Sequence, residues 1–161
     1  MSEIDPNMKQ MKVSALKDGT VLDHIPSAQI FRVIDILQLA DSNHQITFGI
    51  NLDSKTLGKK GIIKISGRKF EDSELNKIAL IAPHATVNTI EEFKVVKKRQ
   101  ISIPSVITGI ARCMNPVCIT NHEQIETKFS IIQTKEEIDL FCHYCEKITN
   151  SKNLKIISNP H

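Results

Sequence analysis

The chain has 161 residues, of which 24% are charged and 4% aromatic, and its formal net charge at pH 7 is +3. This length suffices for one ordinary domain or two small ones, and so weak a positive charge does not by itself favour nucleic-acid binding. No stretch approaches the roughly 18 uninterrupted apolar residues of a membrane span, and the N-terminus lacks the apolar core of a signal peptide. We therefore expect a cytoplasmic protein that does not contact a membrane.

The first hundred residues switch repeatedly between strand and helix patterns. Short strands are predicted at 12–17 and 20–25 around the dipeptide at 18–19, Asp-Gly, which is typical of β-hairpin turns. Residues 26–40 follow a 3.6-residue apolar period, which predicts a helix of three to four turns, and Ser27 could cap its start.

The remaining part of this region continues the alternation. A second helix is expected to begin at Asp72 and Ser73 and to end at Pro83. The other predicted strands lie at residues 45–52, 62–66, 85–90 and 92–96. The resulting order of strands and helices is that of the ferredoxin-like (βαββαβ) fold, an antiparallel sheet with both helices on one face. The chain is therefore expected to be of the α+β class, with this fold over residues 1–100.

A second, smaller domain is expected over residues 101–161. A connector without clear periodicity, residues 97–106, precedes it, and all four cysteines fall within 113–145. Strand-like runs at 128–133 and 138–142 indicate a small antiparallel β domain. Since about fifty-five residues bury little apolar surface, something besides an apolar core must hold this domain together.

The cysteines provide a candidate for that role. Their spacing is C-x4-C, 23 intervening residues, then C-x2-C, and each short loop can bring two thiolates to one ion. Four thiolates leave no open coordination position, so the pattern predicts a structural Zn²⁺ site rather than a catalytic one. The alternative is a set of buried free thiols with a redox-active C-x2-C pair. The predicted zinc ligands are Cys113, Cys118, Cys142 and Cys145.

Several stretches, in this order, resemble the regulatory chain of aspartate carbamoyltransferase: GTVLDHIP, ITFGINL, GKKGIIKI, IAPHATVNTIEEFKVVKK and CHYCEK. The resemblance implies a non-catalytic subunit of an enzyme of de novo pyrimidine biosynthesis. Such a subunit binds CTP and ATP in its N-terminal domain, with UTP as a further candidate ligand, and docks the catalytic chain through its zinc domain. It also implies a homodimer formed by the N-terminal domains, for which the strand at 45–51 is our candidate contact.

Carried over by motif, the resemblance also implies a set of nucleotide-binding residues. Cations for a triphosphate, a carboxylate for ribose hydroxyls and apolar side chains for a base are all present among them. The chain departs from the family pattern at Ser14 and Phe93, where Glu and Tyr are usual, so the preferred nucleotide is not predicted. The implied residues are Ser14, Ala15, Leu16, Val21, Asp23, His24, Lys60, Lys64, Asn88, Ile90, Phe93, Val95 and Lys98.

The resemblance implies in the same way that Asn115, Glu146 and Lys147 contact the catalytic chain.

One alternative function is an RNA-binding protein that combines a ferredoxin-like sheet with a zinc ribbon, but the strands offer only Phe48 and Phe93 for base stacking. An enzyme is the least favoured class, because a closed four-thiolate site and no paired acid and base leave nothing to perform chemistry.

Overall fold

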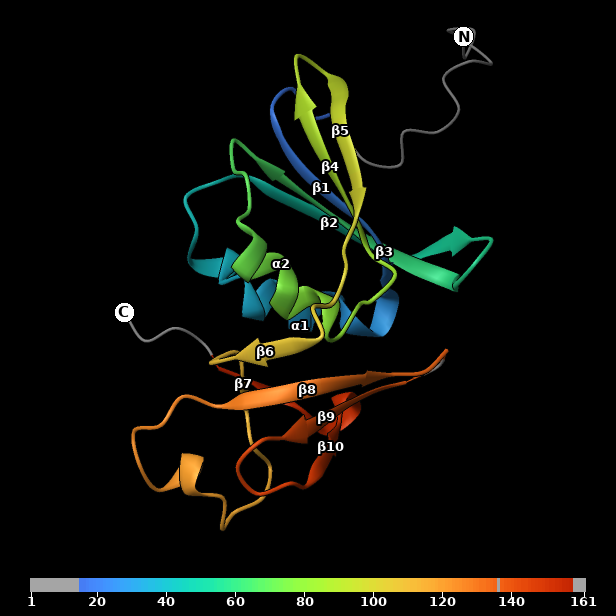
Figure 1. Cartoon of the computed structure of the whole chain (residues 1–161). Coiled ribbons are helices and arrows are strands. Elements are labelled where there is room, and N and C mark those ends of the chain that lie inside the picture. The colour runs from blue at the N-terminus through green and yellow to red at the C-terminus, as the bar shows by residue number, and fades with distance from the viewer. Residues whose placement is uncertain (1–14, 136, 158–161) are drawn as a thin grey trace, which may run out of the picture.

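The computed structural model describes residues 15–135 and 137–157, which form two β-sheet modules, one above the other in Figure 1. We call them the N-terminal module (residues 15–100) and the C-terminal module (residues 106–157). A short segment, residues 101–105, joins them.

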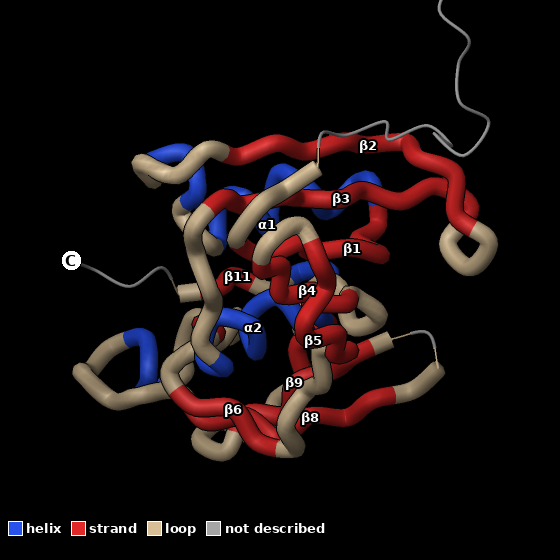
Figure 2. The backbone as a smooth tube through the Cα atoms, turned by 90° about the horizontal axis from the view of Figure 1, so that it is seen from above, coloured by secondary structure: helices blue, strands red, loops and turns tan. Residues whose placement is uncertain are grey.

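The N-terminal module has the predicted ferredoxin-like plan. Its sheet has the strand order β2-β3-β1-β4-β5, every neighbouring pair is antiparallel, and Figure 2 shows the strands side by side in this order. The order β2-β3-β1-β4, with one helix after β1 and one after β3, is the ferredoxin-like arrangement, and β5 extends it at one edge. The elements are β1 Gly19–Pro26, α1 Ile30–Ile36, β2 Ile46–Ser54, β3 Gly58–Ser66, α2 Asp72–Ala79, β4 Thr86–Glu91 and β5 Lys94–Gln100.

Both helices cover the same face of this sheet, as Figure 1 shows. Leu22 lies directly opposite Ile63 on β3 and Val87 on β4, and all three side chains are buried. Because side chains alternate along a strand, the residues between these positions point to the other face, which neither helix covers. That second face is therefore open to a ligand.

Three expectations for the start of the chain are wrong: the hairpin at residues 18–19, the length of the helix over residues 26–40 and its cap at Ser27. Ala15 and Leu16 lie in no strand and Lys17 and Asp18 form a bend, while residues 12–14 lie outside the described residues. Since β1 pairs with β3 at one edge and with β4 at the other, no edge is left for a hairpin with the residues before Gly19. The first α-helix is only seven residues long, because Gln38 adopts a left-handed conformation and breaks it. Ser27 does not cap it; its hydroxyl accepts a hydrogen bond from Asn51 N at 3.0 Å instead.

The second helix begins where the sequence predicts. Glu71 and Glu74 form a reciprocal capping box that satisfies free N–H groups of the first turn. The helix ends at Ala79, before Pro83, and the intervening residues form a tight turn. Within the described part of the chain, no helix is long and apolar enough to cross a membrane.

The C-terminal module contains more strands than the two that the sequence predicts at 128–133 and 138–142. Its main sheet has the order β10-β9-β8-β6, and a separate pair joins β11 to β7. The predicted connector is also too long, since its first four residues belong to β5 and its last to β6. The strands are β6 Val106–Thr108, β7 Ala111–Arg112, β8 Lys128–Gln133, β9 Ile138–Cys142, β10 Ile148–Asn150 and β11 Lys155–Ile156. In the described part of the whole chain, short 3-10 turns lie at Ser27–Gln29, Leu39–Asp41, Ile119–Asn121 and Ser151–Asn153.

The two modules are packed together at their junction. Leu80, just after α2, is buried in the core of the C-terminal module, and Ile103 packs against both cores. The Arg32 guanidinium of α1 donates a hydrogen bond to the carbonyl oxygen of Leu154. The helices of the N-terminal module therefore contact the C-terminal module directly.

Gly61 provides a test of how tightly α1 is packed on the sheet. A Cβ at this position would overlap with the buried Ile30 side chain, whereas a Cβ at Gly49 on the neighbouring strand would lie 3.4 Å from Leu52 Cδ1. We expect Gly61→Ala to lower the free energy of unfolding by about 1–3 kcal/mol, and the control Gly49→Ala to change it by less than about 0.5 kcal/mol. Urea unfolding of the two variants measures both values, and equal effects would contradict the packing described.

Candidate metal centre and ligand-binding face

The four cysteines come from two loops of the C-terminal module. Cys113 directly follows β7 and Cys118 precedes the 3-10 turn at Ile119–Asn121, while Cys142 ends β9 and Cys145 lies in the turn before β10. Backbone hydrogen bonds close both loops, from Cys118 N to Asn115 O and from Glu146 N to Cys142 O, each at 3.0 Å. We call the loop over residues 113–118 the first knuckle and that over 142–147 the second knuckle.

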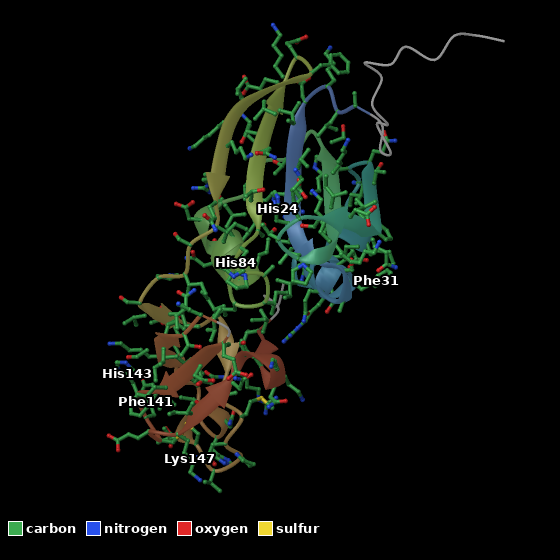
Figure 3. The ribbon with its side chains drawn as sticks, turned by 90° about the vertical axis from the view of Figure 1, so that its right-hand side faces the viewer. His24, Phe31, His84, Phe141, His143 and Lys147 are labelled. Atoms are coloured by element: carbon green, nitrogen blue, oxygen red, sulfur yellow. The ribbon has the colours of Figure 1, made fainter. Side chains whose placement is uncertain are left out.

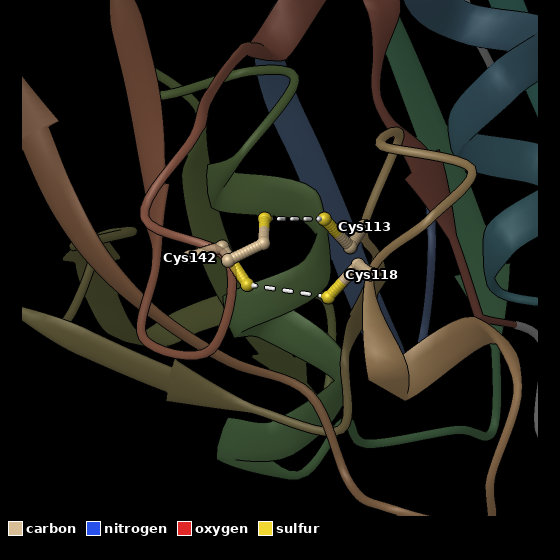
Figure 4. A group of neighbouring side chains, drawn as sticks. Cys113, Cys118 and Cys142 are labelled. Atoms are coloured by element: carbon tan, nitrogen blue, oxygen red, sulfur yellow. Dashed lines mark hydrogen bonds between the residues drawn. The ribbon is translucent and has the colours of Figure 1, made fainter.

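All four sulfur atoms lie within 4.8 Å of one another, and none is in a disulfide. The Cys113–Cys145 and Cys118–Cys142 sulfur pairs are 3.6 and 3.8 Å apart (Figure 4). Four thiolates at about 2.3 Å from a tetrahedral ion would be about 3.8 Å apart, so the two short sulfur–sulfur distances suit the binding of one zinc ion. The redox-pair alternative would leave Cys113 and Cys118 without a role.

The thiols differ in acidity. Burial raises the pKa of Cys113 to about 12 and raises that of Cys142. Burial also acts to raise the pKa of Cys145, but hydrogen bonds from the Asn115 side chain and the Lys147 backbone, together with the neighbouring thiols, lower it to about 7. A metal ion must therefore displace protons from buried thiols when it binds, which makes its affinity greater at higher pH.

Asn121, which the sequence analysis missed, supports the first knuckle from outside. Its amide nitrogen donates to the carbonyl oxygens of Cys113 at 2.9 Å and Asn115 at 2.8 Å, and its carbonyl oxygen accepts from Arg112 Nε at 3.1 Å. No spacing rule marks an asparagine three residues after a ligand, so the sequence alone gave no signal for this role. The knuckle is thus held at its middle as well as at its metal-binding ends.

The three residues implied for contact with a partner lie on these knuckles. Asn115 is in the first knuckle and half-buried, while Glu146 and Lys147 are in the second and exposed. Glu146 has a left-handed backbone with φ of 61°. The metal site and the predicted contact residues are thus parts of one structure.

A row of side chains crosses the open face of the N-terminal sheet. Lys64 lies opposite Val21, Val21 opposite Asn88, and Asn88 opposite Lys98. Directly paired residues share a face, so residues far apart in the sequence are brought into one line across four strands. All four belong to the predicted nucleotide site.

A bulge in β1 shapes one end of this face. The register between β1 and β3 shifts between Leu22 and Ile25, and His24 adopts a left-handed conformation with φ of 59°. In the bulge, Asp23 forms an ion pair with Lys60 at 2.9 Å, and His24 Nδ1 lies 3.2 Å from Thr86 Oγ1. Bulges reorient side chains in this manner, and here the result is a charged cluster.

The opposite end of the face is apolar. Ile90 pairs with Val95, and Phe93 occupies the turn between β4 and β5 with 62% of its surface exposed. Phe93 N donates to Lys17 O at 3.0 Å, which brings the segment containing Ala15 and Leu16 to this end. Ser14 lies outside the described residues. The predicted base-contacting residues thus gather at one end and most of the charged residues at the other.

Asn88 has an unusual environment in the middle of this face. Its Oδ1 atom is buried and has no hydrogen-bond partner, the only such side-chain atom found within 15–135 and 137–157. An unsatisfied buried oxygen costs about 1–3 kcal/mol, which a ligand donor would recover. Nearby, partial burial lowers the pKa of Lys64.

Two further residues of this face were missed by the sequence analysis. Ile62 lies between Lys60 and Lys64 on β3 and, by alternation, points to the same face; the period of two in KKGIIKI could have identified it. Thr86 contacts His24 across strands, and only the register between β1 and β4 reveals this.

The fold and these two sites define a class of protein: a ligand-sensing module with an open sheet face, joined to a small metal-stabilised module that can hold a partner. Family models match both parts. The aspartate carbamoyltransferase regulatory chain allosteric domain matches residues 11–102, and the metal binding domain of the same chain matches residues 105–155.

Relatives named aspartate carbamoyltransferase regulatory chain match nearly the whole chain. That of Phocaeicola vulgatus is 44% identical over 155 residues, 96% of this chain and 99% of the relative. Those of Pyrococcus abyssi and Thermococcus sibiricus are 47% and 48% identical over 149 residues, covering 91% and 92% of this chain and 97% of each relative.

The chain belongs to the aspartate carbamoyltransferase regulatory chain family. It is accordingly a non-catalytic, allosteric subunit of an enzyme of pyrimidine biosynthesis, and its partner is a catalytic chain. Its C-terminal part is a metal-binding domain whose four clustered cysteines suit structural zinc. The alternative of an RNA-binding protein finds no support in these comparisons.

Removal of the metal should affect the two modules differently. Binding energy on the order of 10 kcal/mol in small zinc modules is also folding energy, so a chelator is expected to unfold residues from about 105 onward while the N-terminal sheet persists. Backbone amide hydrogen exchange before and after chelation measures which residues unfold. Metal analysis of the untreated protein should show one zinc per chain. If the backbone amides of β8 and β9 stayed as protected from exchange after complete loss of zinc, the metal would not have a structural role.

Proposed function

We propose that the open face of the N-terminal sheet binds CTP and ATP, with UTP as a further candidate, and that this binding regulates the catalytic chain. The observation that carries the proposal is the buried, unpartnered oxygen of Asn88 in the middle of a row that also contains Lys64 and Lys98. Such an oxygen can accept a hydrogen bond from a base or a ribose.

The distribution of side chains supports a nucleoside triphosphate as the ligand class. Ile90 and Val95, with the nearby Phe93, provide an apolar end for a base. Lys60, with Asp23 and His24 in the bulge, provides cations for phosphates and a carboxylate for hydroxyl groups at the other end. Ligand binding there would replace part of the Asp23–Lys60 pairing.

The metal site completes the proposal. Residues 1–100 form the allosteric domain and residues 101–161 the zinc domain, with one structural zinc ion per chain. Asn115, Glu146 and Lys147 contact the catalytic chain from knuckles that are already rigid, which lowers the entropy cost of docking. Thiolate ligands need a reducing compartment, in keeping with a cytoplasmic location.

Two copies of the chain associate through β2, in this proposal. Among the described strands, β2 is one edge of the sheet, and an edge strand can pair with a strand of another chain. Phe48 and Ile50 are exposed on it, and the Phe48 ring packs edge-to-face on that of Phe31, with centroids 5.6 Å apart. A second copy would cover these side chains.

Regulation then follows from the junction between the modules. A nucleotide that binds one relative placement of the modules more tightly shifts the population toward that placement. Coupling energies of about 1–3 kcal/mol are typical and are reciprocal for binding, so the catalytic chain must change nucleotide affinity by the same factor.

Two adjacent lysines on β5 offer a matched test of the ligand face. Lys98 pairs with Asn88 on the open face, whereas Lys97 pairs with Thr89 and so points to the other. We expect Lys98→Ala to weaken CTP binding by about 10-fold or more, because a charge-assisted hydrogen bond contributes about 1.5–3 kcal/mol. Lys97→Ala removes the same charge and should change the affinity less than about threefold.

Calorimetric titration of the full chain with CTP and ATP gives these affinities. Equal losses in the two variants would show that only net charge matters and that the open face is not the site. Reconstitution with the catalytic chain, followed by activity against aspartate with and without each nucleotide, tests the regulatory part of the proposal.

Two lysine substitutions on opposite faces of β2 test the proposed dimer contact. Phe48→Lys places a charge in the exposed apolar surface, and Thr47→Lys places the same charge on the opposite face of the same strand. We expect Phe48→Lys to be monomeric at micromolar concentration and Thr47→Lys to remain dimeric, since burying an unpaired charge is costly. Sedimentation equilibrium distinguishes them, and a dimeric Phe48→Lys variant would exclude this contact.

A further inference from the structure

A cleft lies where the two modules meet. The N-terminal module forms one wall, through the end of β1, the first half of α1 and the turn between α2 and β4, and the C-terminal module forms the other, through the β8–β9 turn and the 3-10 turn at Ser151–Asn153. The volume of this cavity is about 290 Å³. Figure 3 shows His84, which belongs to the first wall, on the side of the N-terminal module that is turned towards the C-terminal module. We call this cavity the junction cleft.

The junction cleft is separate from the sites described above. None of its lining residues belongs to the sets implied to bind nucleotide, zinc or the catalytic chain. Pro26 lies on its wall, whereas Asp23 and His24, in the bulge of the same strand, belong to the open face. Pockets for drug-sized ligands have volumes of roughly 300–1,000 Å³, so this cleft suits a ligand smaller than a nucleoside triphosphate.

Apolar side chains line the deeper part of the cleft. Leu80 and Ile81 of the N-terminal module and Ile138 of the C-terminal module are lining residues, and all three are buried. Side chains of this kind exclude water and lower the local dielectric constant, which strengthens the interaction of nearby charges with a ligand. The cleft is therefore a better place for recognition of an ion than the open protein surface.

Cationic groups predominate among the polar lining residues. Arg32, Lys135 and Lys152 are cations, and Glu137 is the single carboxylate among the described lining residues. Lys152 Nζ and Glu137 Oε1 form an ion pair at 3.2 Å, so these two charges largely offset each other. The charges of Arg32 and Lys135 remain, and His84 adds a hydrogen-bond donor in either protonation state.

Arg32 gives the clearest indication that an anion binds here. Its side chain is half-buried and donates a hydrogen bond to the carbonyl oxygen of Leu154, but no carboxylate within residues 15–135 and 137–157 forms an ion pair with it. A guanidinium group carries further N–H donors in a planar fork that suits phosphate and carboxylate oxygens. Because a partly buried charge without a counter-charge is unfavourable, a bound anion would stabilise this arrangement.

We propose that the junction cleft binds a small phosphate-bearing anion, held by Arg32 and His84 from one module and by Lys135 and Lys152 from the other. A phosphate group suits this set better than a carboxylate, because its oxygens can accept hydrogen bonds from donors that converge from two walls. Free inorganic phosphate and the phosphate group of a small metabolite share this chemistry. An anion that contacts both walls also favours the placement of the modules described above over other placements.

Titration of the full-length, zinc-loaded chain with sodium phosphate tests this site, with sodium chloride adjusted to keep the ionic strength constant. NMR follows the Arg32 side chain and the His84 ring on one wall and the backbone amide of Lys152 on the other. We expect all three signals to shift with the same dissociation constant. A parallel titration with glycerol 3-phosphate distinguishes the two sources, because a site for a metabolite should bind the ester more tightly than the free ion.

Substitutions on both walls, with a matched control, measure the contribution of the charges. Arg32→Gln should raise the dissociation constant at least about 10-fold, because charge-assisted hydrogen bonds are lost. Lys152→Gln, which leaves the Glu137 carboxylate uncompensated, should raise it at least about threefold, and it keeps the test valid if loss of the Leu154 contact prevents Arg32→Gln from folding. Lys155→Gln removes the same charge from an exposed lysine that does not line the cleft and should change it less than about twofold.

Absence of saturable shifts in the unsubstituted chain would overturn the proposal. Equal weakening in Lys152→Gln and Lys155→Gln would also overturn it, since phosphate would then respond to net charge alone. Lys98→Ala, on the open face, is expected to leave the dissociation constant at the three probes unchanged, and a loss there would assign the phosphate to the proposed nucleotide site instead. If CTP did not bind the chain, the proposed function would be refuted while phosphate shifts at the junction cleft would still support this site.

Discussion

Convergence of four thiols on one point is the constraint on which the C-terminal module depends. Two loops 24 residues apart, each closed by its own backbone hydrogen bond, bring sulfur atoms within 4.8 Å of one another. The apolar core beside them is small, and three of the four cysteines form part of its buried surface. Metal ligation therefore replaces the hydrophobic burial that a longer domain would provide, and it also fixes the loops that carry Asn115, Glu146 and Lys147.

The N-terminal module follows a different principle, one-sided coverage of a sheet. Both helices pack on the face that carries Leu22, Ile63 and Val87, so the alternate residues of the same strands line the other face. The strands that build the core thus also present Lys64, Asn88 and, on the added strand β5, Lys98. The period of two along each strand thus separates the side chains that build the core from those that line the open face, which lets the open face vary without loss of the core.

The junction packs the two modules against each other. Leu80 follows the helix that covers the sheet, yet it is buried in the core of the metal-binding module. Each module also carries exposed apolar side chains of its own, Phe48 on β2 and Ile148 on β10. In the proposed function, a ligand on the sheet would influence a partner bound to the other module through this shared packing.

The sequence by itself determined the element types in the N-terminal module, the four cysteine ligands and, through motif resemblance, the family. These features depend on local periodicity and short spacings, which the chain displays directly. It did not reveal the true start of β1 or the four smallest strands of the C-terminal module, because the pairing of these strands involves positions distant in sequence. No local pattern marked Gln38 as the left-handed residue that follows the short first helix. Only the tertiary structure decided that Val21, Lys64, Asn88 and Lys98 form one row and that Val106, Phe141 and Ile148 form another, since strand register is a property of the paired chains and not of either strand alone.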